Sequence, residues 1–448
     1  SAIISAYAGH GFGSEALHLY KSMLQSGIEP DRITFIYLFK ACVLLDSSNL
    51  CKLLHFHVLN HSLDSDFMIG SILIDTYFKT GNILDACKVF KMFQVQNVLI
   101  WNALLTGYAE NGLGEEAIKS FESMRKAGVL PNLVTYICTL KSCGIVNNSA
   151  KGEEIHAELS RERLLEKNLF LATSLVDMHC KCGAIIKAKK VFDEIQVPDV
   201  VSWNALIGGY AQHGYGEEAL NFFERMKHQH HLIPDAHTFI CALKASGSIG
   251  FASKGREIHN EIARTRLLNT DISVATALVD MYAKCGSLVE AKVAFDKLSS
   301  RDLISWNALI GGYTRQHAGE EALDCFDEMR EKSISPNVVT YVFVLKACGI
   351  VGAPYKGQEL HMEVLKKGLL DSVASIGSSL IEMYTSCGLL CVARTVFDKL
   401  SVRDIYSWNA LIGGYVAREC DEKALECFNE IGGISRRCNI CLCLESLC

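Results

Sequence analysis

Apolar side chains along residues 200–235 fall into two stripes of helical period with a polar break between them. The first stripe has apolar residues three or four positions apart: Trp203, Leu206, Ile207 and Tyr210. This is the spacing of one helix face. After the break His213-Gly214-Tyr215-Gly216, two glutamates that suit the positive end of a helix dipole open a second stripe. Its apolar residues are Leu220, Phe222, Phe223 and Met226. The pattern predicts a hairpin of two helices that ends near Pro234.

The same hairpin recurs along the whole chain. The four tryptophans stand in WNALL or WNALI sequences at intervals of 102, 103 and 102 residues: Trp101, Trp203, Trp306 and Trp408. Within one block, the segments 200–235, 236–271 and 272–302 each show the hairpin pattern. Repetition at a fixed period indicates structural units that stack on one another. We therefore expect an all-α protein, an α-solenoid of thirteen stacked helix-turn-helix repeats that forms a superhelix.

The expected repeats form one continuous array from residue 1 to residue 439. Their boundaries are 1–31, 32–66, 67–97, 98–132, 133–168, 169–199, 200–235, 236–271, 272–302, 303–337, 338–373, 374–404 and 405–439. Residues 440–448 form a cysteine-rich truncated tail. The chain begins inside a repeat and without Met, so we interpret it as a fragment or processed chain whose start says nothing about its destination.

The composition fits an ordered helical array. Apolar residues make up 49% of the chain and only 6 of its 448 residues are proline, which argues against disorder. No run of about 18 apolar residues is present that could span a membrane.

The 19 cysteines follow the repeat. One shared position holds Cys42, Cys143 and Cys348, with Ser246 in the remaining block, and another holds Cys182, Cys285 and Cys387, with Thr80 in the remaining block. Disulfide partners could not be exchanged for Ser or Thr, whereas small core residues could. We therefore favour buried free thiols in a reducing compartment over disulfides.

The repeated sequences resemble those of the pentatricopeptide repeat family, in its plant-type form with alternating P, L and S motifs. The resemblance rests on VSWNALIGGYAQHGYGEEAL, on LKACG with KGQELH, and on SLVDMHCKCG with AKKVFDEI, and it covers residues 1 to about 439. It implies a monomeric, non-enzymatic protein without cofactor that binds single-stranded RNA in mitochondria or chloroplasts, with two or three side chains reading one base per repeat. The C-terminal extension and DYW-type deaminase domain of some such proteins are absent from this sequence.

The resemblance assigns base reading to the fifth and last residues of each motif. In the P motifs these pairs are Ser1 with Asp31, Asn102 with Asn132, Asn204 with Asp235, Asn307 with Asn337, and Asn409 with Asn439. In the S motifs they are Ser71 with Asn97, Thr173 with Asp199, Thr276 with Asp302, and Ser378 with Asp404. The L motifs have aliphatic fifth residues that cannot bond a base edge, so we expect them to act as spacers: Ile36, Ile137, Ile240 and Val342.

The chemistry of these pairs predicts a target. Asp only accepts hydrogen bonds and suits guanine and uracil, whose ring nitrogens carry a hydrogen, whereas Asn can donate to adenine and cytosine. The resemblance further pairs a small hydroxyl at the fifth position with purines and Asn with pyrimidines. The predicted RNA reads, 5′ to 3′, G-n-A-Y-n-G-U-n-G-Y-n-G-Y, where Y is C or U, because the Asn–Asn pairs resemble readers that prefer cytosine and tolerate uracil.

Two further sets of residues complete the implied RNA site. The second residues of the motifs would stack against bases: Met68, Leu99, Phe170, Val201, Ile304 and Tyr406. Lysines of the first helices would contact phosphates: Lys40, Lys141, Lys244 and Lys346 in L motifs, and Lys79, Lys181 and Lys284 in S motifs. The S-motif lysines each follow an Asp by four residues and can pair with it, whereas the L-motif lysines have no such partner. A net charge of −6 weighs against nucleic-acid binding, and a solvated helix face is the alternative interpretation of all seven lysines.

Other motifs resemble metal-binding or base-stacking sequences, but their positions in the repeat have structural explanations. The H-x-E sequences at His156, His259 and His361 match half of a deaminase zinc signature, yet all occupy one position of successive L motifs without a following P-C-x-x-C. The C-x-x-C from Cys438 to Cys441 lacks a second ligand pair, so we expect no metal there. The repeated Trp and Tyr residues lie on the apolar stripe and are expected in the hairpin cores rather than on a stacking surface.

We interpret the chain as the recognition part of an organelle C-to-U editing or RNA-processing factor. Editing would require a deaminase, either supplied in trans with accessory proteins or lost when the fragment was made. Transcript protection, splicing or translation are the alternatives within RNA biology. A protein-binding scaffold of the helical-repeat type is the alternative from another class. The P and S motifs favour RNA because their fifth residues are all Asn, Ser or Thr and their last residues all Asp or Asn, which packing alone does not demand at both positions.

Overall fold

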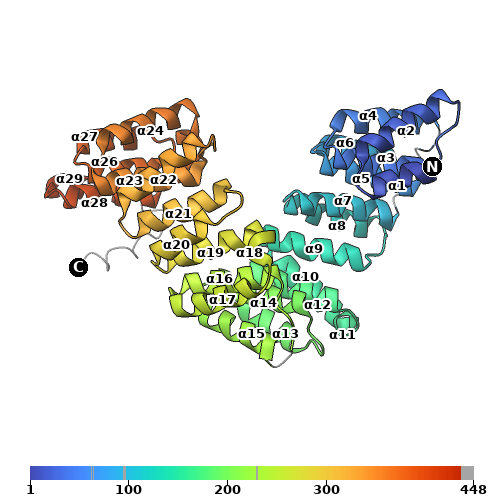
Figure 1. Ribbon diagram of the computed structural model, residues 1–448, viewed down its shortest axis with the longest axis horizontal. Helices are drawn as coiled ribbons and strands as arrows, with labels where there is room; N and C mark the ends of the chain where they lie inside the picture. The colour runs from blue at the N-terminus through green and yellow to red at the C-terminus, as the bar shows by residue number, and fades with distance from the viewer. Residues whose placement is uncertain (62, 64, 94–96, 229–230, 435–448) are drawn as a thin grey trace. The chain divides into compact units, whose positions relative to one another are not determined.

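The computed structural model describes residues 1–448 except 62, 64, 94–96, 229–230 and 435–448. All regular secondary structure in the described residues is helical, from α1 to α29. The chain divides into two compact units, residues 1–213 and 214–448. The all-α prediction is confirmed, and in each unit helices of successive motifs stack on one another (Figure 1).

The first helices of the motifs begin immediately after each Asp or Asn that ends the preceding motif, with one Val as the exception. In the first unit they are α1 (Ala2–Gly9), α3 (Arg32–Leu44), α5 (Phe67–Lys79), α7 (Val98–Glu110), α9 (Leu133–Ile145), α12 (Leu169–Lys181) and α14 (Val200–Gln212). In the second unit they are α16 (Ala236–Ser248), α19 (Ile272–Lys284), α21 (Leu303–Arg315), α23 (Val338–Val351), α26 (Ala374–Ser386) and α28 (Ile405–Val416). Neighbouring first helices pack side by side, as α5 does with α7 and α26 with α28.

The second helices pack against the first helices of their own motifs wherever both helices belong to the same unit. In the first unit they are α2 (Gly13–Gln25), α4 (Ser48–Asn60), α6 (Ile83–Met92), α8 (Gly114–Lys126), α10 (Ser149–Arg161) and α13 (Ile185–Asp193). The second unit contains α15 (Gly216–His228), α17 (Ala252–Arg264), α20 (Leu288–Asp296), α22 (Gly319–Glu331), α24 (Pro354–Lys366), α27 (Leu390–Lys399) and α29 (Asp421–Ile434). The second helices of the S motifs have only 9 or 10 residues, which accounts for the shorter S segments.

Three short helices at the junctions between L and S motifs are absent from the sequence-based expectation. They are α11 (Leu164–Lys167), α18 (Leu267–Thr270) and α25 (Leu369–Ser372). Each is a single turn, so its sequence is too short to show a helical period.

The turn inside a hairpin requires a residue with left-handed backbone. Gly112 (φ 74°) occupies it between α7 and α8, and Gly286 (φ 74°) occupies it between α19 and α20. Glycine adopts this conformation without the steric cost of a side chain, which explains the Gly at most of these turns. Asp46, Asn147, His317 and Glu419 occupy the same left-handed position in the other hairpins.

The tryptophans lie in the hairpin cores, as predicted. Trp203 and Trp306 are at most 1% exposed, and Trp101 and Trp408 are also buried. Each ring contacts a phenylalanine of the preceding S motif edge to face, at centroid distances of 4.5–4.6 Å: Phe90, Phe192, Phe295 and Phe397. These aromatic pairs fix the contact between S and P motifs. Tyr7, by contrast, is 41% exposed because its hairpin is the first of the chain and has no preceding helix to cover it.

The two recurring cysteine positions face each other as free thiols. The Cys182 thiol donates to the backbone carbonyl of Cys143 (3.7 Å), and the Cys387 thiol donates to that of Cys348 (3.8 Å). Cys285 makes the same contact with the carbonyl of Ser246 (3.7 Å). Because the acceptor is backbone, Ser replaces Cys there without changing the bond.

None of the described helices is both long enough and apolar enough to cross a membrane.

Candidate nucleic-acid interface

The last residue of each described P and S motif is the N-cap of the next first helix. In each case Oδ1 accepts a hydrogen bond of 2.8–3.1 Å from a backbone N–H of the first helical turn; the residues are Asp31, Asn97, Asn132, Asp199, Asp235, Asp302, Asn337 and Asp404. A cap uses one of the two terminal atoms of the side chain. The other atom is Oδ2 in Asp, which only accepts, and Nδ2 in Asn, which only donates.

Capping limits one argument drawn from the sequence. Asp66, Asn168 and Asp271 end L motifs, whose fifth residues are aliphatic, and they cap the following helices in the same way. The presence of Asp or Asn at the last position alone therefore does not separate base reading from helix capping. The preference for RNA over a protein scaffold must rest on the fifth position, where no cap is formed.

In P motifs the fifth and last side chains are hydrogen-bonded to each other. Asn102 Nδ2 donates to Asn132 Oδ1 (3.0 Å), and Asn307 Nδ2 donates to Asn337 Oδ1 (3.2 Å). Ser1 Oγ donates to Asp31 Oδ2 (2.9 Å). Bonds from the Thr34 side chain and backbone hold the pKa of Asp31 below its ordinary value. The sequence-predicted pairs are thus adjacent in these three motifs. Asn204 lies in the first unit and Asp235 in the second.

In S motifs the corresponding side chains are not bonded to each other, among the four pairs that the structure describes. Ser71 and Ser378 instead donate to backbone carbonyls three residues earlier, those of Met68 (2.9 Å) and Ser375 (3.0 Å). The Thr276 hydroxyl is buried without a hydrogen-bond partner. It is therefore available to a ligand that enters beside it, which a satisfied core hydroxyl would not be.

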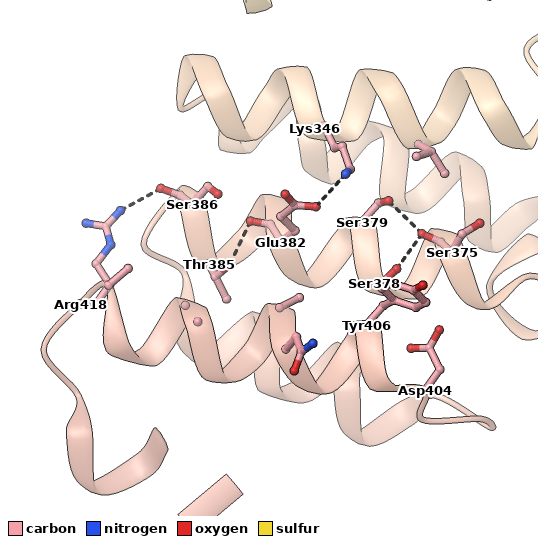
Figure 2. A pocket seen from close by; sticks show the side chains of 16 residues that line it. Lys346, Ser375, Ser378, Ser379, Glu382, Thr385, Ser386, Asp404, Tyr406 and Arg418 are labelled. Carbon is pink, nitrogen blue, oxygen red and sulfur yellow. Dashed lines mark hydrogen bonds and ion pairs between the residues drawn. The ribbon is translucent and has the colours of Figure 1, made fainter. Parts of the chain in front are cut away.

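The fifth, last and second residues line common hollows between first helices of the second unit. One hollow of about 920 Å³ is lined by Val342, Lys346, Ser378, Glu382, Asp404, Tyr406 and Asn409. Figure 2 shows labelled side chains of this hollow on neighbouring helices, with Lys346 facing Glu382 and Asp404 near Tyr406.

A second hollow, of about 630 Å³, repeats this lining one block earlier in the chain. It is formed by Ile240, Lys244, Thr276, Asp280, Asp302, Ile304 and Asn307. Each of these residues precedes its counterpart in the first hollow by 102 positions. The groove is therefore periodic, with one L, one S and one P motif contributing to each period.

The expected stacking residues are all exposed. Phe170, Ile304 and Tyr406 are 67%, 68% and 71% exposed, and Met68, Leu99 and Val201 are exposed as well. Ile304 and Tyr406 lie on the rims of the two hollows. Exposed apolar side chains at one recurrent position can cover the faces of bases.

The S-motif and L-motif lysines differ in ion pairing as the sequence predicts, with Lys346 as the one exception. Lys79, Lys181 and Lys284 pair with Asp75, Asp177 and Asp280 at 2.7–2.8 Å. Lys40, Lys141 and Lys244 are exposed and make no ion pair with a described residue.

Lys346 is the exception, because it has an acidic partner on another helix, which the i,i+4 prediction did not concern. In this block Ser386 replaces the S-motif lysine, so Glu382 is left without its i+4 partner. Glu382 pairs across the helices with Lys346 at 3.4 Å instead.

The histidines of the H-x-E sequences, and His55 at the equivalent position of the first block, join L motifs to S motifs. His55, His259 and His361 are hydrogen-bonded through Nδ1 to the hydroxyls of Tyr77, Tyr282 and Tyr384, at 2.8–3.0 Å. In the second block the tyrosine is replaced by His179, whose Nε2 lies 3.1 Å from His156 Nδ1. Burial lowers the pKa of His179 to about 4, so both rings are neutral at pH 7. The described residues contain no group of three His, Cys, Asp or Glu side chains placed to hold a metal.

Sequence reasoning missed one recurring side chain of the groove. The third residue of each L motif is a fully buried threonine: Thr34, Thr135, Thr238 and Thr340. The signal was present, because Asp or Asn followed by Thr three residues later, as in DRIT and NLVT, is typical of a capping box. Asn439 and the cysteine-rich tail lie outside the described residues.

Comparison with known proteins gives consistent matches. A model described as the PPR repeat family matches residues 1–43, 96–144, 198–246 and 301–349. A second, described as the PPR repeat, matches residues 71–98, 170–197, 273–303 and 406–433.

Curated relatives come from Arabidopsis thaliana. The pentatricopeptide repeat-containing protein At2g03380, mitochondrial, is 34% identical over 93% of this chain and 60% of its own length. The pentatricopeptide repeat-containing protein At4g18520, chloroplastic, is 32% identical over 95% of this chain and 68% of its own length. The chain spans about half to two thirds of the length of such relatives.

A solved structure shares the fold. The maize pentatricopeptide repeat protein PPR10, in its complex with an 18-nt psaJ RNA element, aligns with a TM-score of 0.65. The alignment covers 96% of this chain and 68% of PPR10 at 17% sequence identity. The solenoid architecture expected from the sequence agrees with this alignment.

Proposed function

Because the chain belongs to the pentatricopeptide repeat family, we propose that it is a non-catalytic array that binds single-stranded RNA and reads its sequence. Each P or S motif presents one fifth residue and one cap residue to one base. The PPR10 structure of the same fold contains a bound RNA element, which supports this class of ligand.

The observation that carries the proposal is the periodic groove. Each of the two periods combines polar side chains at the fifth positions of an S and a P motif, the second atom of a cap, an exposed apolar side chain and a lysine. Single-stranded nucleic acid offers the matching set of base edges, base faces and phosphates at regular spacing. A protein-binding scaffold needs no such period of chemistry along one face.

The target follows from the pairs. We expect the RNA to read G-n-A-Y-n-G-U-n-G-Y-n-G-Y from 5′ to 3′, with the L motifs spacing the readers. The Ile and Val side chains at their fifth positions are half-buried and offer a base no hydrogen bond.

The biological setting is an organelle. Relatives are named mitochondrial and chloroplastic, and we place this chain in one of these compartments as the recognition part of an RNA-editing or RNA-processing factor. In an editing factor, base conversion would then be performed by a deaminase domain, either on the full-length protein or on a partner.

Replacing Thr276 by Asn tests the reading assignment. Asp302 retains its acceptor for a ring N–H, while the fifth residue changes from a small hydroxyl to an amide. We expect the preferred base at this position to change from guanine to uracil, measured by binding of RNAs that differ only there. An unchanged preference for guanine would contradict the assignment of Thr276 as a reader.

A further inference from the structure

The two Asn–Asn pairs are each closed by a threonine from the next motif. Thr135 Oγ1 lies 2.7 Å from Asn102 Oδ1, and Thr340 Oγ1 lies 2.8 Å from Asn307 Oδ1. Both threonines are fully buried at the third position of their L motifs. Neither belongs to the residues assigned to reading, stacking or phosphate contact.

The direction of each bond follows from the backbone. The Thr135 backbone N–H donates to Asn132 Oδ1 (3.1 Å), so the oxygen of the Asn132 amide must face the helix. The same oxygen accepts from Asn102 Nδ2 (3.0 Å), which turns the Asn102 oxygen toward Thr135 Oγ1. The threonine oxygen accepts the Asn132 backbone N–H (3.1 Å), and its single proton goes to Asn102.

The hydrogen bonds among Asn102, Asn132 and Thr135 form a closed ring, and only hydrogen-bond donors of these side chains remain free to contact a ligand. Both amide oxygens are occupied, and the free hydrogens belong to the Nδ2 groups of Asn102 and Asn132. Cytosine has a bare ring nitrogen that can accept from such a donor, whereas the ring nitrogen of uracil carries a hydrogen and would face another donor.

We propose that Thr135 and Thr340 are positioning residues that make these two motifs prefer cytosine to uracil. The inference rests on the proposed function and gives a physical cause for cytosine preference at two of its three Y positions. Without the hydroxyl, the oxygen of the buried Asn102 side chain would lose its donor. A buried acceptor without a partner is costly, so the amide would turn its oxygen into the groove, where the N–H of uracil can donate to it.

The hydroxyls of Thr135 and Thr340 also lie 3.1 and 3.0 Å from the cap oxygens Asn132 Oδ1 and Asn337 Oδ1, farther than from the fifth-position oxygens. In Asp-ended motifs the cap carboxylate is itself the short contact of the equivalent threonine. Thr34 Oγ1 lies 2.6 Å from Asp31 Oδ1, and Thr238 Oγ1 lies 2.8 Å from Asp235 Oδ1. There the hydroxyl proton goes to the carboxylate of the cap. The positioning role is therefore assigned only to the two described P motifs that end in Asn, 98–132 and 303–337.

The test compares Thr135→Val, Thr135→Ser and Thr340→Val in the full chain. Valine keeps the shape and removes the hydroxyl, whereas serine keeps the hydroxyl. Binding is measured on four RNAs with C or U at the base read by Asn102–Asn132 and at the base read by Asn307–Asn337, and thermal unfolding monitors the fold.

For the wild type we expect about a tenfold preference for C at each position. Thr135→Val should reduce it to about twofold at the first position only, Thr340→Val at the second only, and Thr135→Ser should retain it. Full preference in both valine variants, or equal loss at both positions in either one, would overturn the inference. So would a wild type that binds the RNA but does not distinguish C from U. A wild type that binds none of the RNAs would instead overturn the proposed function.

Discussion

At the scale of single residues, the interface uses side chains that also hold the fold. Asp302 caps a helix with Oδ1 and leaves Oδ2 free, and the Asn132 amide is oriented by the same kind of cap. The positions of these residues could be predicted from the sequence by counting along the repeat. Their hydrogen bonds could not, because Asn102 meets Asn132 across 30 residues whereas Ser71 and Ser378 bond to their own helices.

A buried histidine predicts acid sensitivity in the second block. The folded chain has a pKa of about 4 for His179, against 6.5 for the free side chain. Below pH 6.5, His179 therefore binds a proton in the unfolded chain, whereas in the folded chain it stays neutral down to about pH 4. The free energy of unfolding falls across this pH window by on the order of 3 kcal/mol.

His179→Tyr should remove this loss. The substitution restores the His–Tyr pair found in the other three blocks, and tyrosine does not titrate in this range. Melting temperatures measured between pH 7 and pH 4 should fall less steeply for the variant than for the wild type. Parallel curves for the two proteins would show that His179 is not the acid-sensitive group.

At the scale of helices, most of the fold could be predicted because the apolar period and the Asp or Asn before each stripe mark where first helices begin. The exceptions have physical reasons. Single-turn helices such as α11 and α18 have no period to detect. Val373 precedes α26 without a side-chain cap, and the local sequence gives no cap signal there.

Substitutions of Asp302 can distinguish its role as a helix N-cap from its proposed role in base recognition. Serine also caps helices well, whereas alanine does not, at a cost of about 1 kcal/mol. Asp302→Ser should therefore unfold near the wild-type temperature and Asp302→Ala below it. Both should lose the preference for guanine over adenine at the position read with Thr276, because neither has a second acceptor atom. If Asp302→Ser keeps that preference in binding assays, Asp302 serves the helix alone.

At the scale of the whole molecule, the negative net charge conceals an uneven distribution of lysines. Lys40, Lys141 and Lys244 are exposed in the first helices without an ion pair among the described residues, whereas Lys284 and Lys346 are paired. The sequence predicted the i,i+4 pairs. It could not predict the Lys346–Glu382 pair, because that contact depends on how α23 packs against α26.

Replacing a lysine by alanine should weaken RNA binding more when that lysine has no ion-pair partner in the protein than when it has one. Lys244→Ala should weaken all RNAs alike and reduce the slope of log affinity against log salt by about 0.7, the value for one phosphate contact with a single strand. Lys284→Ala should have a smaller effect because Asp280 already neutralises that lysine. Glu382→Gln should release Lys346 and strengthen binding. A loss confined to particular sequences in Lys244→Ala would mean that this lysine contacts a base.

The central claim is that the groove reads sequence, and a salt-titrated binding assay with two single-stranded RNAs tests it most directly. One RNA has the sequence G-n-A-Y-n-G-U-n-G-Y-n-G-Y. The other has A in place of G at the three positions read by Thr173–Asp199, Thr276–Asp302 and Ser378–Asp404. We predict that the first binds at least about tenfold more tightly at every salt concentration, a difference of roughly 1.4 kcal/mol or more. Equal binding of the two RNAs, or binding of neither, would contradict the account.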